Sequence, residues 1–238
     1  MSSRQGEAAL PDWGFDPAIH AAPAPAGLSL WALAAAGGIG AVLAWLLLGL
    51  LGVAAFAALF LGGLVWITSN AGRAMLRRHR ATRVRPGARP RVENIVTGLA
   101  PRTGIEVPAV WEIADDGANA LVCFTTRPAI ALTTGLMESY TRTELEAVVA
   151  HCCVRLRALA SPLERARLAL SYVSPGFGPS VGAAQDVLVA AITRYPPGLA
   201  SAIAKAVPRS GRGAGFWFAA EGATHVPAAE RSKALLDL

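Results

Sequence analysis

Residues 141–156, TRTELEAVVAHCCVRL, carry the clearest secondary-structure signal in the chain. Thr141 stands three residues before Glu144, which is the spacing of a capping box at the start of a helix. The apolar residues that follow recur at helical spacing, as on the buried face of an amphipathic helix: Leu145, Val148, Val149, Cys152, Leu156 and Leu159. The stretch therefore predicts a helix that begins at Thr141 and buries this face in a domain.

Short strands are predicted before this helix, and further helices after it. Apolar residues favour strands within VPAVWEIA (107–114), LVCF (121–124) and AIALTT (129–134), with a turn at Asp115, Asp116 and Gly117. Helical spacing is found at 92–99 and again at 162–172, 184–194, 198–206 and 228–237. Helix, short strands and then more helices predict an α+β domain.

The N-terminal part of the chain has the composition of a membrane segment. No charged residue occurs between Asp16 and Arg73, and every residue from Leu30 to Trp66 is apolar or glycine. As one straight helix this run would be about 55 Å long, against a hydrocarbon core of about 30 Å. Two spans fit better, roughly over 28–47 and 51–68, with Gly49 and Gly52 available for the turn. One long tilted helix is the alternative.

A cluster of arginines predicts the orientation in the membrane. Positive charge directly after a span marks the cytoplasmic side, and these residues precede the first acid, Glu93: Arg73, Arg77, Arg78, Arg80, Arg83, Arg85, Arg89 and Arg91. With two spans the N-terminal tail is cytoplasmic as well. An anionic lipid surface attracts such residues by about 1 kcal/mol each. No aromatic or base-reading residues accompany them, which argues against a nucleic-acid partner.

These observations predict a multi-pass protein of the cell (inner or plasma) membrane whose main domain is cytoplasmic. The predicted organisation is a flexible tail over 1–26, a two-helix transmembrane hairpin over 27–69, a basic juxtamembrane linker over 70–90 and a domain over 91–238. Membrane lipids are predicted partners of the hairpin and of the Arg73–Arg91 cluster. On the cytoplasmic side, Cys123, Cys152 and Cys153 are expected to be reduced thiols.

Four stretches of the domain resemble the HtpX-like membrane zinc metallopeptidases, relatives of the CAAX prenyl proteases. They are ADDGANAL (114–121), AIALTTGLMESYTRTELEAVVAH (129–151), TRYPPGLASAIAKA (193–206) and ATHVPAAER (223–231), the last with Val226 where a proline is usual. The resemblance implies a zincin-type cytosolic domain of helices and a small sheet. It also implies that 129–135 is an edge strand, along which a peptide could bind by strand addition.

The residues of the metal site depart from this family. Active members use His-Glu-x-x-His, in which two histidines bind zinc and the glutamate is the general base. His151 matches the first histidine, but Cys152 stands at the general-base position and Arg155 at the second histidine. The third ligand of the family is a glutamate four residues before an aspartate; Asp186 matches the aspartate, and Gly182 takes the glutamate's place. No catalytic residue is therefore assigned, and His151 is predicted to be a vestigial ligand.

Several interpretations of this altered site remain open. Cys152 could be a nucleophile whose pKa Arg155 lowers, but its place on the apolar face favours a buried core thiol. His151 is expected to hydrogen-bond or pack in the former cleft. We predict a membrane-anchored, catalytically inactive homologue with no bound cofactor (zinc in active relatives) and a role in binding a peptide or protein partner, or in regulation. The alternatives are an active zinc-dependent membrane metalloendopeptidase with an unorthodox site and a purely structural membrane protein.

Overall fold

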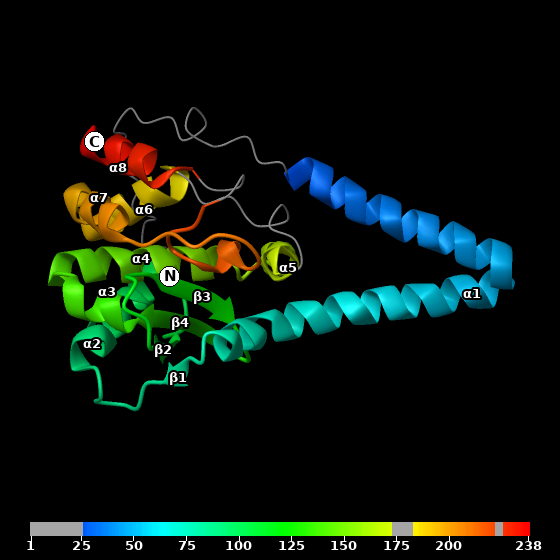
Figure 1. The fold of residues 1–238 in the computed structure, drawn as a ribbon, viewed down its shortest axis with the longest axis horizontal. Coiled ribbons are helices and arrows are strands. Elements are labelled where there is room, and N and C mark those ends of the chain that lie inside the picture. Colours follow the sequence, from blue (N-terminus) through cyan, green and yellow to red (C-terminus); the bar gives the residue numbers. More distant parts are fainter. Residues whose placement is uncertain (1–25, 173–182, 222–225) are drawn as a thin grey trace, which may run out of the picture.

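A four-stranded mixed sheet lies beneath the longest helix of the folded body in the computed structural model (Figure 1). The structure describes residues 26–172, 183–221 and 226–238, so nearly all of the predicted tail falls outside it. The strand order is β1-β2-β4-β3, with β2 parallel to β4 and the other pairs antiparallel. The strands are β1 (Thr82–Arg83), β2 (Ala109–Ile113), β3 (Ala120–Phe124) and β4 (Pro128–Thr133).

Each helix that the sequence predicts for the body is present, in the predicted order along the chain. Helix α4 contacts β3 on one side and α6 and α7 on the other, and α7 in turn contacts α8 (Figure 1). The helices of the body are α2 (Pro90–Leu99), α3 (Thr134–Ser139), α4 (Arg142–Ala158), α5 (Pro162–Ser171), α6 (Ala183–Thr193), α7 (Pro196–Lys205) and α8 (Ala228–Leu236). The prediction of an α+β domain is confirmed; the short helix α3 was not predicted.

Helix α4 begins with the predicted capping box. The Glu144 amide donates to Thr141 Oγ1 at 3.3 Å, and the Thr141 amide donates to Glu144 Oε2 at 2.8 Å. The helix is buried on more than its apolar face, because every residue from Ala147 to Leu156 is buried. Its polar residues His151 and Arg155 therefore lie in the interior of the protein, where they need partners.

Helix α1 (Ala26–Arg78) projects from the body and bends at Gly49 (Figure 1). Gly49 has φ 64° and ψ −152°, a backbone conformation that residues with a side chain rarely adopt. The Phe56 ring lies where a Cβ on Gly40 would be, so the two arms of α1 touch. Residues 34–78 form a helical segment that is long and apolar enough to cross a membrane. The mean hydropathy of its most apolar 18 residues is 2.5.

The end of α1 is part of the body rather than a linker. Residues 70–78, predicted as the first half of a linker, continue the helix because Ala71, Met75 and Leu76 are buried against the core. A Cβ on Gly72 would lie 2.0 Å from the Phe124 carbonyl oxygen, so only glycine allows this approach of α1 to β3. Part of the second half of the predicted linker pairs with β2 as strand β1.

The expectation that residues 129–135 form an edge strand is wrong. Strand β4 is paired on both sides, in parallel with β2 and antiparallel with β3. Its residues Ala129–Leu132 are fully buried, which is typical of a strand covered on both faces. The outer strands of the sheet are β1 and β3, so a peptide cannot add to β4.

We expect Thr141→Ala to lower the free energy of unfolding by about 1 kcal/mol, because it removes the oxygen that accepts the Glu144 amide. Thermal or urea unfolding of the full chain in detergent measures this. Thr97→Ala, an exposed change within α2, is the control and should be close to neutral. Equal stability of the two variants would mean that this cap does not hold the start of α4.

Candidate functional site around His151

His151 lies at the centre of a buried polar cluster formed by α4, α6 and α8. Its side chain is fully buried, and its ring packs edge-on against Phe218 with 5.0 Å between the ring centroids. Nδ1 is 3.4 Å from Asp186 Oδ1, a long separation for a hydrogen bond, and neither ring nitrogen is hydrogen-bonded to a residue that the structure describes. Burial lowers the pKa of His151 to about 4 despite the nearby carboxylate, so the ring is neutral at pH 7.

Asp186 is held by an arginine from α8 rather than by His151. The Arg231 Nη2 and Nε atoms donate to the two Asp186 carboxylate oxygens, each at 2.7 Å, and both side chains are buried. Burial alone would raise the pKa of Asp186, but the Arg231 charge and its two hydrogen bonds hold it at about 2. The Asp186 carboxylate is therefore ionised, and both of its oxygens are hydrogen-bonded to the Arg231 guanidinium.

Arg155 points into the protein, and its side chain binds main-chain carbonyls. Its Nη1 donates to the Trp217 carbonyl at 2.7 Å, and its Nη2 donates to the Gly215 carbonyl. Burial lowers the pKa of Arg155 to about 10, which still leaves the group charged at pH 7. The positive charge of Arg155 thus lies one helical turn from His151, as the sequence predicts. It is hydrogen-bonded to Gly215 and Trp217, which are far from it in the sequence.

Cys152 is a buried thiol on α4. It is fully buried, and burial raises the pKa of its thiol although the nearby Arg155 charge acts in the opposite direction. A protonated, inaccessible thiol is neither a nucleophile nor a base at neutral pH. Its position therefore fits the interpretation as a core thiol. Cys123 and Cys153 are also free and buried.

The described residues around His151 do not fit a catalytic zinc ion. Such a site needs three protein ligands and an open position. Within 26–172, 183–221 and 226–238, no three His, Cys, Asp or Glu side chains come together in a group that could hold a metal. Both oxygens of Asp186 accept hydrogen bonds from Arg231, and the permanently charged Arg155 lies one helical turn from His151. Gly182 lies outside the described residues.

Sequence reasoning did not anticipate the aromatic residues that close this cluster. Phe218 contacts His151 and also lies under Arg231, whose Cζ is 5.8 Å from the ring centroid. Phe216, Trp217 and Phe218 are almost fully buried. The run GFWF at 215–218 was the available signal, because aromatic residues make up only 7% of the chain.

Comparisons with known proteins support the resemblance over part of the chain. The chain is 35% identical over 100 residues to the "Protease HtpX homolog" of Limosilactobacillus reuteri (strain DSM 20016), and equally to that of Limosilactobacillus reuteri subsp. reuteri (strain JCM 1112). The match covers 41% of this chain and 34% of each relative, so it spans about a third of these relatives. No family model matches the chain. The similarity and the apolar helix α1 suggest a membrane protein of a metallopeptidase-like family.

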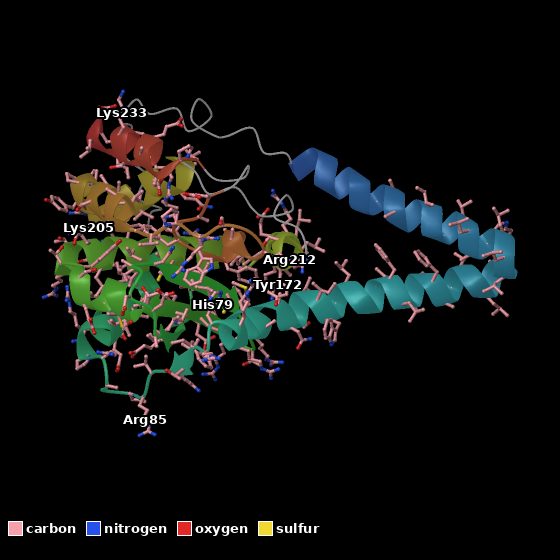
Figure 2. The ribbon with its side chains drawn as sticks, viewed as in Figure 1. His79, Arg85, Tyr172, Lys205, Arg212 and Lys233 are labelled. Carbon is pink, nitrogen blue, oxygen red and sulfur yellow. The ribbon has the colours of Figure 1, made fainter. Side chains whose placement is uncertain are left out.

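We expect Arg231→Met to lower the free energy of unfolding by about 3–5 kcal/mol, because the buried Asp186 carboxylate would lose its partner. Denaturant unfolding of the full chain measures the loss. Lys233→Met is the matched control, an exposed change on the same helix (Figure 2).

The double variant Asp186→Leu/Arg231→Met should regain part of that stability, because no charge is then left unpaired. A loss for Arg231→Met no larger than that for the control would contradict the buried ion pair.

Proposed function

We propose that this chain is a membrane-anchored homologue of the HtpX-like metallopeptidases, with a zincin-type domain that has lost peptide hydrolysis. Its role is then to bind a protein or peptide partner, or to regulate an active relative, at the membrane. The observation that carries the proposal is Arg155, which stands where the family has its second zinc-binding histidine and donates to two main-chain carbonyls.

Zinc-dependent hydrolysis needs a metal with an open position and a base for the bound water. At the base position this chain has Cys152, a buried thiol with a raised pKa. At the second ligand position it has a guanidinium, which cannot bind a metal. The first ligand, His151, is enclosed by Phe218 and Asp186. These three observations support loss of the chemistry while the family fold is kept.

In this proposal the two arms of α1 cross the membrane twice, and the body lies on the cytoplasmic side. The bend at Gly49 and the contact between the arms support two spans. Two arginines of the Arg73–Arg91 cluster are used within the body, because Arg89 pairs with Glu112 and Arg91 donates to the Tyr140 carbonyl. The other six members are exposed and are left to contact anionic lipid: Arg73, Arg77, Arg78, Arg80, Arg83 and Arg85.

The orientation is tested by reporter fusions in a bacterial inner membrane. A reporter after Leu238 and one before Ser2 should both report the cytoplasm, because two spans return the chain to the side where the arginines lie. Reporters on opposite sides would indicate one long span. A C-terminus outside the cytoplasm would also remove the basis for expecting reduced cysteines.

Loss of the zinc site is tested by restoring the family residues together. We expect the triple variant Cys152→Glu, Arg155→His and Gly182→Glu to bind zinc, so that zinc raises its unfolding temperature, because metal binding couples to folding. Without zinc this variant should be less stable than the parent, since the Gly215 and Trp217 carbonyls lose their donor.

The double variant that keeps Arg155 is the matched control and should respond to zinc much less, because it lacks a ligand. An equal zinc-dependent rise in the unmodified parent would contradict the proposal and favour an active metalloendopeptidase with an unorthodox site.

A further inference from the structure

Residues 215–219, here called the inner segment, run alongside the outer edge of β3. Trp217 forms an antiparallel bridge with Leu121, and the Phe218 amide donates to the Ala120 carbonyl at 2.7 Å. The inner segment thus takes main-chain positions that a further strand of the sheet would take.

The Asn119 side chain extends this pairing by one residue. Its Nδ2 donates to the Ala219 carbonyl at 2.8 Å, and its Oδ1 accepts the Ala219 amide at 3.2 Å. Both main-chain groups of Ala219 are therefore satisfied by one amide side chain, as they would be by a neighbouring strand. Asn119 is fully buried, so these bonds form away from water.

On its other side the inner segment contacts the altered metal site. Arg155 donates to the carbonyls of Gly215 and Trp217, and Phe218 packs on the His151 ring. The segment therefore lies between β3 and the part of α4 that carries the vestigial ligand. A peptide could not add to β3 beside His151 without first displacing it.

The end of α1 supports the same segment. The His79 ring meets Trp217 edge-on with 4.9 Å between centroids, and the Arg209 guanidinium lies 5.2 Å from the centre of the Trp217 ring. His79 lies where α1 enters the body (Figure 2). The inner segment is thus held at α4, at β3 and at the base of the helix proposed to cross the membrane.

We infer that the inner segment is a built-in occupant of the outer edge of β3, where an added peptide strand would otherwise pair, and that Arg155 is the residue that positions it. One replacement then has two effects, because the arginine removes a zinc ligand and also supplies the donors that hold the inner segment between α4 and β3. A peptide partner of this protein must bind elsewhere. The inference rests on the proposed function only in taking Arg155 as the replacement of a zinc-binding histidine.

Hydrogen exchange followed by mass spectrometry on the full chain in detergent tests this inference. In the unmodified protein the amides of 217–219 should exchange as slowly as those of β3, because both groups are hydrogen-bonded and buried. Arg155→Met should speed exchange in 217–219 by about tenfold or more, since hydrogen bonds from a charged group are lost. The amides of 142–150 in α4 should change much less.

Arg157→Met is the matched control, because Arg157 is exposed on the same helix and should leave every rate unchanged. If Arg155→Met does not fold, Arg155→Lys replaces it, since lysine keeps the charge but lacks the planar fork that reaches two carbonyls. We expect intermediate exchange for the lysine variant. Rates in 217–219 equal to those of the parent, in whichever variant folds, would overturn the inference.

A fluorescent peptide with the sequence AGFWFAA, taken from 214–220, provides a second measurement on the unmodified chain. No saturable binding is expected, because the edge of β3 is already occupied. Saturable binding that an Asn119→Leu change abolishes would overturn the inference, because it would show that this edge is open. Zinc uptake by the parent would contradict the proposed function and leave the exchange rates unaffected, so the two failures are distinguishable.

Discussion

The buried guanidinium of Arg155 is the constraint on which the interior of this protein depends. A charge removed from water is tolerated only when its hydrogen bonds are satisfied. The donors of Arg155 find the carbonyls of Gly215 and Trp217, residues more than fifty positions away in the sequence. The path of 215–217 against α4 follows from that requirement, and the placement of Phe218 against His151 follows in turn.

A buried ion pair joins α6 to α8 beside the same helix. Asp186 on α6 and Arg231 on α8 neutralise each other in the interior, and burial keeps His151 neutral beside them. The two buried arginines thus have different partners, one a carboxylate and the other main-chain carbonyls. In place of a metal with open coordination, the described part of the interior holds charges already satisfied by protein atoms. This arrangement of satisfied charges is the physical ground for the proposal that the chain keeps a fold of this kind without a metal site.

Local sequence signals predicted the elements of the fold, and long-range contacts accounted for the errors. The capping box at Thr141, the helices of the body other than α3 and the three longer strands could be read from spacing and turn residues. The partners of Arg155 and the central position of β4 depend on contacts between distant residues, which leave no periodic signal. The continuation of α1 into the body was missed because its arginines masked the buried face formed by Met75 and its neighbours.

Among the residues that the structure describes, His151 lacks the companions that a metal ion would need. The most direct measurement is the zinc content of the full chain, purified in detergent without chelators and equilibrated with zinc at neutral pH before removal of the excess. We expect zinc far below one ion per chain, and the same content in His151→Ala. Stoichiometric zinc in the unmodified protein that is lost in His151→Ala would contradict it.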